Sequence, residues 1–133
     1  MRLGLNLGTG GPVPPADTLA LVQAAERLGY SVVWTSEAYG ADAASVLGWL
    51  AAHTTTIGLG TAVLQIPARS PALTAMTAAT LDLLSGGRLT LGLGVSGPQV
   101  SEGWHGVRFD RPLARTREYV DVVRIALARQ TVR

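Results

Sequence analysis

The stretch 57-IGLGTAVLQIPARSP-71 contains a change from one kind of secondary structure to another. Residues 57–66 form an uncharged apolar run, which is typical of a strand covered on both faces of a sheet. Ser70 followed by Pro71 indicates a helix start, because serine caps free backbone amides and proline tolerates the first helical position. The stretch therefore predicts a strand, a short loop and a helix.

The same strand-and-helix pattern occurs on both sides of this stretch. Apolar or β-branched runs bounded by breaker residues predict strands at 2–7, 31–36, 57–66 and 89–95. A helical spacing of apolar residues follows each run. The predicted order along the chain is βαβαβαβα.

The predicted helices have recognisable ends. The starts are assigned to capping residues or to proline, namely Asp17, Asp42, Ser70-Pro71, and Asp110 with Pro112. The first helix is predicted to stop at Gly29 and the third at Gly86-Gly87, because glycine readily adopts the left-handed conformation that ends a helix.

Four such units with short connections predict a parallel α/β sheet, because a crossover helix returns the chain to start each parallel neighbour. At 133 residues the chain, 1–133, is interpreted as a single domain. Two architectures fit the pattern. A doubly wound sheet is complete with four or five strands, whereas a (β/α)₈ barrel needs about 250 residues. Length alone favours the doubly wound sheet.

Composition restricts the chemistry of the site. Cysteine is absent, which excludes disulfides and thiolate catalysis, and the two histidines, His53 and His105, are too far apart in sequence to indicate a local metal site. Apolar runs stay shorter than a membrane span, and the start MRLGLNLG lacks the features of a secretion signal. We therefore expect a soluble cytoplasmic protein that binds neither metal nor membrane.

Basic residues are concentrated near the end of the chain. Residues 108–133 carry seven arginines against three acidic residues. Such a segment can attract nucleic acid, but here the arginines alternate with an apolar helical stripe. The pattern favours the solvated face of an amphipathic helix, without nucleic-acid binding.

In both candidate architectures ligands bind at the carboxyl ends of the strands. These ends are predicted at Gly8–Gly11, Ser36–Tyr39, Ala62–Pro67 and Gly94–Trp104. Glu37 could act as a base or bind a polar ligand group, and its alternative is a solvated or helix-capping acid. Tyr39 could pack on a ligand or cover the rim of the sheet.

Residues 92–97 read GLGVSG, which has the G-x-G-x-x-G spacing of a dinucleotide-binding loop. In such a loop the helix begins within the motif, so that its free amides meet the pyrophosphate. Here Pro98 follows, and we expect irregular structure as far as Phe109. The glycines instead predict a strand end that allows close approach by another group.

Three aromatic side chains have two interpretations each. His105 could be a general base, or it could stabilise its own loop. Trp104 could stack on a ring or anchor the loop to the body of the protein. His53 could be a ligand, but it is predicted to cap the carboxyl end of the second helix.

Four segments together resemble a known family, the luciferase-like flavin-dependent monooxygenases, in particular their F420-dependent oxidoreductase branch. They are 34-WTSEAYGADA-43, 58-GLGTAVLQIPARSP-71, 81-LDLLSGGRLTLGLGVSGPQVSEGWHG-106 and 109-FDRPLARTREYV-120. The resemblance implies a (β/α)₈ barrel of which this chain is the amino-terminal half, which reverses the preference from length.

The resemblance also implies a cofactor and its surroundings. The cofactor would be coenzyme F420, with FMN as the alternative, used for hydride transfer or monooxygenase-type chemistry on a small organic substrate. A cis peptide bond is implied between Ala62 and Val63, in a bulge against the cofactor ring. By the same likeness, the residues near the ring would be Ser36, Glu37, Ala62, Val63, Gln65, Gly94, Ser96 and Gly97. Glu37 is the candidate catalytic residue among them.

A half-barrel leaves its first and fourth strands as open edges. We therefore expect a homo-oligomer or a complementary barrel half as a partner, beside the small-molecule substrate. Two other functions stay open: a non-catalytic flavin-binding or interaction module, and a four-strand nucleotide-binding α/β domain.

Overall fold

The computed structural model describes residues 1–8 and 13–131. Its main sheet is parallel, and its strands are β1 (Gly4–Asn6), β2 (Val32–Thr35), β3 (Gly58–Thr61) and β5 (Leu89–Thr90), in that spatial order. A second parallel pair, β4 (Leu64–Gln65) with β6 (Leu93–Gly94), follows β3 and β5 along the chain. The strand runs expected from the sequence are present, but they are shorter.

The spatial order of the strands decides between the two architectures. Each strand of the main sheet lies beside the one that precedes it in this sheet, so the order never reverses. A doubly wound sheet needs a reversal, where its ligand binds, whereas a barrel adds strands in sequence. The structure therefore has the arrangement of one part of a barrel, with β1 and β5 as the edge strands of the sheet, as expected for the first and fourth strands.

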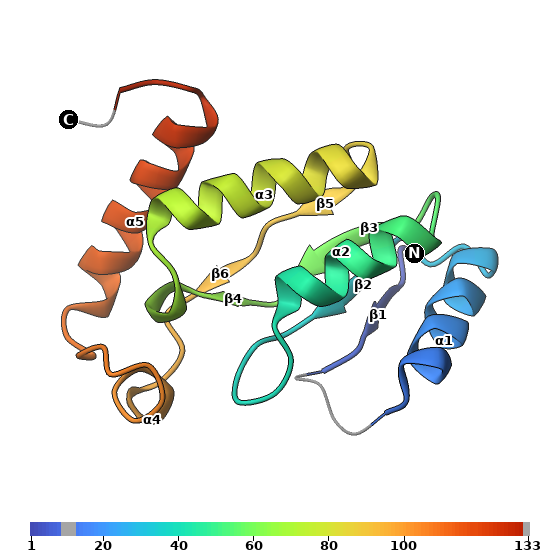
Figure 1. Cartoon of the computed structure of the whole chain (residues 1–133), viewed down its shortest axis with the longest axis horizontal. Coiled ribbons are helices and arrows are strands. Elements are labelled where there is room, and N and C mark those ends of the chain that lie inside the picture. Colours follow the sequence, from blue (N-terminus) through green and yellow to red (C-terminus); the bar gives the residue numbers. More distant parts are fainter. Residues whose placement is uncertain (9–12, 132–133) are drawn as a thin grey trace.

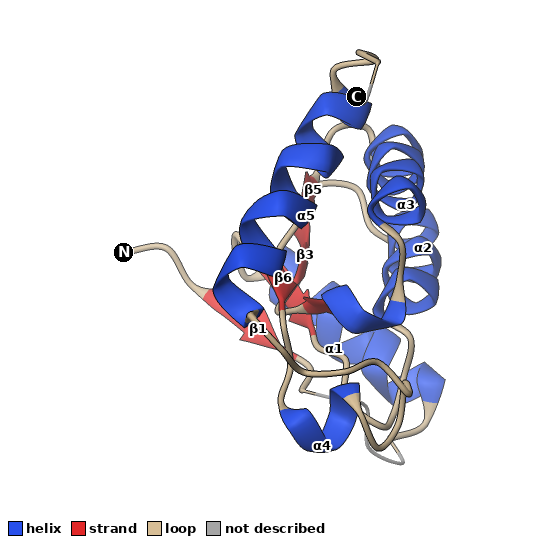
Figure 2. Ribbon diagram, turned by 90° about the vertical axis from the view of Figure 1, so that its left-hand side faces the viewer, coloured by secondary structure: helices blue, strands red, loops and turns tan. Residues whose placement is uncertain are grey.

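The helices pack against one another in chain order. They are α1 (Pro15–Arg27), α2 (Ala43–His53), α3 (Pro71–Ser85), α4 (Pro98–Ser101) and α5 (Pro112–Leu127), with a 3₁₀ turn, η1, at Ile66–Ala68. α1 contacts α2, α2 contacts α3, and α3 contacts α5 (Figure 1). Figure 2 shows α2 and α3 together on one side of the strands.

Capping residues set two helix starts as the sequence predicts. The Asp42 side chain accepts a hydrogen bond from the Ser45 amide at 2.7 Å, and Ser70 accepts one from the Leu73 amide at 3.1 Å. Gly86 ends α3 in the left-handed conformation, with φ of 68°. Each of these interactions joins residues that are three or four positions apart in the sequence, so the sequence pattern is sufficient to predict it.

Two expectations about helix starts are wrong. Asp17 does not cap α1, because the helix already begins at Pro15, and Asp17 lies in its first turn. Residues after Gly97 are not irregular throughout, because the short helix α4 begins at Pro98. In both cases proline occupies the first helical position, where its fixed φ favours the helix and no amide donor is needed.

The predicted strands 57–66 and 89–95 are each interrupted. A cis peptide bond between Ala62 and Val63 separates β3 from β4, as the family resemblance implied. Opposite it, the Thr61 hydroxyl donates to the Gly92 carbonyl and accepts from the Gly92 amide, both at 2.8 Å. A Cβ atom at Gly92 would collide with the Thr61 carbonyl oxygen, so glycine is needed at this interruption.

Two apolar clusters hold these elements together. The larger one lies between the sheet and the first three helices and contains the fully buried Val22, Val33, Leu47, Leu50 and Leu59. The smaller one joins η1 and α3 to α5 through Ile66, Ala75, Tyr119 and Val123. Burial of this apolar surface is the main favourable contribution to folding.

Candidate active site

Three segments at the carboxyl ends of the strands meet at one end of the sheet. They are the loop after β2, the bulge between β3 and β4, and the segment from β6 to α4; Figure 1 shows the loop after β2 and α4 in the lower part of the view. The fourth predicted strand end, Gly8–Gly11, lies outside the described residues except for Gly8. The Gly8 amide donates to the Asn6 side chain at 2.8 Å.

The bulge is fixed by the loop that follows β2. The Ser36 hydroxyl donates to the Ala62 carbonyl at 2.6 Å, and the Glu37 amide donates to the Val63 carbonyl at 3.3 Å. Ala62 is exposed and Val63 is half-buried. The bulge therefore presents an apolar surface whose carbonyl groups are already bound by the neighbouring loop.

Glu37 is buried beneath this surface, with 7% of its side chain exposed. One carboxylate oxygen accepts a hydrogen bond from the Ala43 amide at 3.0 Å, at the start of α2. The other accepts from the Gln65 amide at 2.9 Å and from the Arg69 guanidinium at 2.8 Å. Glu37 thus caps a helix and ties β4 to the loop; its catalytic role stays a prediction.

Arg69 links the two acidic residues of the loop. Its guanidinium pairs with Glu37 and also with Asp42. Burial alone would raise the pKa of Asp42, but hydrogen bonds from Ser45 and the Arg69 charge outweigh burial and hold the pKa below its usual value. The site therefore contains two carboxylates and one guanidinium, with a net charge of −1.

Gln65 lies in β4, two residues beyond the bulge, and is 2% exposed. Its side-chain amide donates to the Ala38 carbonyl at 3.2 Å, and its side-chain oxygen lies 2.8 Å from Nε2 of His105. The side chain consequently joins the loop after β2 to the segment after α4.

Gly94, Ser96 and Gly97 follow on the neighbouring strand. A Cβ atom on Gly94 would lie 2.5 Å from a methyl carbon of Val63, so the strand passes close to the bulge. Ser96 has a positive φ of 61°. Within residues 1–8 and 13–131, the amides of Ser96 and Gly97 donate no hydrogen bond.

These residues fit a flat cofactor ring with polar edges. The exposed Ala62 and half-buried Val63 offer apolar contact, while the two unused amides of Ser96 and Gly97 offer donors. The structure brings Ser36, Ala62, Val63 and Gly94 together at the bulge, with Gln65 just beyond it. Their contact with a cofactor stays a prediction.

Two exposed aromatic residues at this end of the sheet, Tyr39 and Trp104, pack against each other. Tyr39 and Trp104 pack edge to face with ring centroids 5.7 Å apart, and each is more than half exposed. This contact holds the loop of Trp104 against the loop after β2, while stacking of Trp104 on a ring stays a prediction. Nδ1 of His53 lies 2.8 Å from the Trp49 carbonyl in the last turn of α2, as predicted for a cap.

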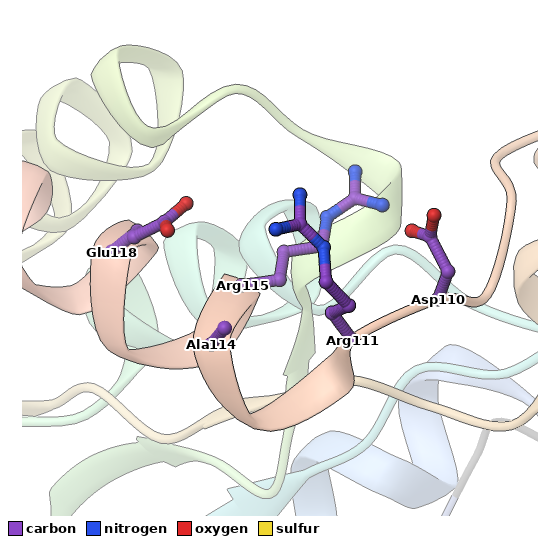
Figure 3. A pocket seen from close by; sticks show the side chains of 5 residues that line it. All are labelled: Asp110, Arg111, Ala114, Arg115 and Glu118. Carbon is purple, nitrogen blue, oxygen red and sulfur yellow. The ribbon is translucent and has the colours of Figure 1, made fainter.

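The arginines of α5 lie on its outer surface. Arg111 and Arg115 line a pocket of about 220 Å³ with Asp110, Ala114 and Glu118, and Figure 3 shows both guanidinium groups projecting to the same side of the helix. The two acids balance the two arginines. Further along the helix, Arg117 and Arg124 are exposed and Val123 is buried, as the amphipathic pattern predicts. The buried face also contains Tyr119, whereas Leu113 and Leu127, which the apolar spacing places on that face, are exposed.

In the part of the chain that the structure describes, no three His, Asp or Glu residues gather as a metal site would require. No described helix is long and apolar enough to cross a membrane.

Sequence reasoning missed Arg69, although its guanidinium pairs with both acidic residues of the site, Glu37 and Asp42. Arg69 and Glu37 are 32 residues apart, so no local pattern connects them.

A sequence model of the family described as luciferase-like monooxygenase matches residues 1–133. Among curated proteins, a Mycobacterium tuberculosis protein named "putative coenzyme F420-dependent oxidoreductase" is 56% identical over 131 residues. That alignment covers 98% of this chain and 38% of the relative, so the chain spans well under half of the relative's length.

Two solved structures show the same fold. Monooxygenase RslO1 of Streptomyces bottropensis superposes with a TM-score of 0.84 at 30% identity, covering 94% of this chain and 42% of that one. The coenzyme F420-dependent tetrahydromethanopterin reductase of Methanopyrus kandleri gives 0.80 at 26% identity, covering 93% and 39%. The fold is thus a parallel α/β arrangement similar to about half of the barrel of these enzymes, and the chain belongs to the luciferase-like monooxygenase family.

Proposed function

We propose that the protein carrying this chain is an oxidoreductase that uses coenzyme F420 to transfer hydride to or from a small organic substrate. The observation that carries this proposal is the 56% identity, over nearly the whole chain, to the mycobacterial relative named for F420. FMN is the alternative cofactor, and monooxygenase-type chemistry is the alternative reaction.

The residues of the bulge have defined tasks in this proposal. The ring, when bound, supplies a two-electron hydride acceptor or donor. Ala62 and Val63 would form its apolar support, with Ser36 holding the Ala62 carbonyl away from the ring. The amides of Ser96 and Gly97 would bind its polar edge. Glu37 and Gln65 would hold the loop after β2, β4 and the segment after α4 in fixed relative positions through their hydrogen bonds.

Residues 1–133 supply only one wall of the proposed cofactor pocket. Because the chain spans 38% of the mycobacterial relative, we assign the opposite wall to the remaining half of a barrel, whether in the same polypeptide, a complementary chain or a second copy. Substrate choice, assembly into an oligomer and a cytoplasmic location are part of the same proposal.

A cofactor titration tests the proposal. The full-length protein is titrated with F420 and, separately, with FMN, while absorbance and fluorescence are followed. We expect F420 to bind at least tenfold more tightly than FMN. Gly94→Val should weaken F420 binding because the added side chain enters the space beside Val63. Arg124→Gln on the exposed face of α5 is the control and should bind normally.

The other outcomes of this titration would each favour a different function. Tighter binding of FMN would replace F420 by FMN in the proposal. Binding of either cofactor without turnover would favour the non-catalytic flavin-binding module, and binding of a purine nucleotide alone would favour the nucleotide-binding domain.

A further inference from the structure

A second cavity lies next to Gln65 and His105 and is lined on one side by Trp104. It has a volume of about 330 Å³, which is at the lower end of the range for small-molecule sites. Its walls come from the loop after β2 (Glu37, Ala38, Gly40, Ala41 and Asp42), from the segment around η1 and the start of α3 (Gln65, Ala68, Arg69 and Leu73), and from Trp104 and His105. It therefore combines charged, aromatic and aliphatic groups from three separate segments.

The orientation of the Gln65 amide follows from its neighbours. The Ala38 carbonyl lies 3.2 Å from the Gln65 side-chain nitrogen, and a carbonyl can only accept a hydrogen bond. The NH₂ group of Gln65 must therefore face Ala38, and its oxygen must face His105. The opposite orientation would place two acceptor oxygens against each other.

This orientation determines which nitrogen of His105 carries hydrogen. Nε2 lies 2.8 Å from the Gln65 oxygen, so Nε2 must be the donor. In a neutral imidazole the other nitrogen, Nδ1, then has a free lone pair. Among the described residues, Nδ1 of His105 has no hydrogen-bond partner. His105 therefore stabilises its loop through Nε2, and its Nδ1 is left as a hydrogen-bond acceptor.

We propose that this cavity is a subsite for a small neutral or cationic ligand, and that Nδ1 of His105 accepts a hydrogen bond from the ligand's hydroxyl or amine group. The identification of this ligand as the substrate rests on the proposed function. The argument for a hydrogen-bond acceptor at Nδ1 of His105 is independent of that function. Gln65 is the positioning residue, because it fixes the tautomer of His105 without needing to contact the ligand.

The charge of the cavity supports this class of ligand. Glu37, Asp42 and Arg69 all line it, and their charges sum to −1. The guanidinium is already paired with both carboxylates, so it offers no free positive charge to an anion. Trp104 and Leu73 add apolar surface for a ring or short alkyl group. An anionic ligand would meet both a lone pair and net negative charge.

Nitrogen-15 NMR of the histidine rings tests the tautomer without any ligand. His53 is an internal reference, because its Nδ1 faces the Trp49 carbonyl and must be a donor there. At a pH where both rings are neutral, we expect hydrogen on Nε2 of His105 and on Nδ1 of His53. His105→Asn and His53→Asn assign the resonances. Hydrogen on Nδ1 of neutral His105 would overturn the proposal.

Binding of simple probes tests the ligand class. Benzyl alcohol and benzylamine should shift the Nδ1 resonance of His105, and benzoate should bind at least tenfold more weakly. His105→Gln should lower the affinity for benzyl alcohol about three- to tenfold, which is the usual effect of losing one hydrogen bond. His53→Gln is the matched control and should leave the affinity unchanged. Equal binding of benzoate, or no effect of His105→Gln, would overturn the proposal.

These measurements separate the inference from the cofactor proposal. A failure of F420 and FMN to bind leaves the tautomer and the probe affinities unaffected. Conversely, a wrong tautomer at His105 would remove the subsite but not the cofactor surface at the bulge.

Discussion

The Glu37 carboxylate and the Arg69 guanidinium form an ion pair 2.8 Å long, with 7% and 12% of their side chains exposed. The pair joins the loop after β2 to the turn that precedes α3. Because each residue also has further partners, the pair fixes the relative position of two walls of the candidate site. Removing one partner leaves the other charge buried.

Arg69→Met should therefore destabilise the protein by about 3–5 kcal/mol, which is the usual cost of breaking a buried ion pair from one side. Urea denaturation gives the change in the free energy of unfolding. Arg108→Gln is the control, because the Arg108–Asp110 pair is 3.8 Å long with both side chains more than half exposed. Its loss should cost at most about 1 kcal/mol. Similar losses for the two variants would show that the Glu37–Arg69 pair is not structural.

Glu26 should make the stability depend on acid pH. Burial alone would raise the pKa of Glu26, but hydrogen bonds from the amides of Thr56, Ile57 and Thr55 outweigh it and lower the pKa to about 2. In the unfolded chain the carboxyl takes up its proton near its ordinary value of 4.5. Its contribution is thus complete above pH 4.5 and is lost as the pH falls toward 2.

Glu26→Gln should flatten the loss of stability between pH 4.5 and 2. Because solvent screens this carboxylate and the glutamine oxygen still accepts hydrogen bonds, the cost at neutral pH should stay at about 1 kcal/mol. Denaturation curves at a series of pH values measure both effects. Glu118→Gln, on the exposed surface of α5, should keep the wild-type slope. A slope for Glu26→Gln that equals the wild-type slope would contradict the prediction.

Gly60 is required by the indole of Trp34 on the neighbouring strand. The two residues are register partners, and a Cβ atom at Gly60 would collide with the six-membered ring of Trp34. Gly60→Ala should destabilise the protein by about 1–3 kcal/mol, since the added methyl forces the indole to move. Trp34→Leu should cost stability alone but reduce the penalty of Gly60→Ala in the double variant. Additive losses, measured by thermal or urea denaturation, would exclude this contact as the cause.

Sequence patterns predicted the elements whose determinants are local. The caps at Asp42 and Ser70 and the stop at Gly86 each depend on residues within one helical turn. The predicted start of α1 is late because Pro15, two residues before Asp17, competes with Asp17 as a helix start and takes the first helical position. Local physical chemistry therefore gives the type of element more reliably than its first residue.

The contacts that build the site are not local, and the residue patterns alone did not reveal them. Glu37 and Arg69 are 32 residues apart, and Gln65 and His105 are 40 residues apart. Each pair exists only because parallel strands bring successive strand ends to one edge of the sheet. The break at Ala62–Val63, by contrast, was predicted, but only by the family resemblance, because residues 57–66 have the pattern of one continuous strand.

Ser36 should affect cofactor binding more than stability. Its hydroxyl donates to the Ala62 carbonyl at 2.6 Å, on the surface where we place the cofactor ring. Ser36→Ala removes this donor, so the carbonyl loses its partner and is free to turn toward the cofactor. We expect about 1 kcal/mol of lost stability and about three- to tenfold weaker F420 binding, measured by urea denaturation and fluorescence titration of the full-length protein. Ser36→Thr keeps a hydroxyl and should restore most of the affinity. If Ser36→Ala binds F420 as tightly as the unchanged protein, the ring does not depend on the position of the Ala62 carbonyl, and the placement of the cofactor at this bulge is wrong.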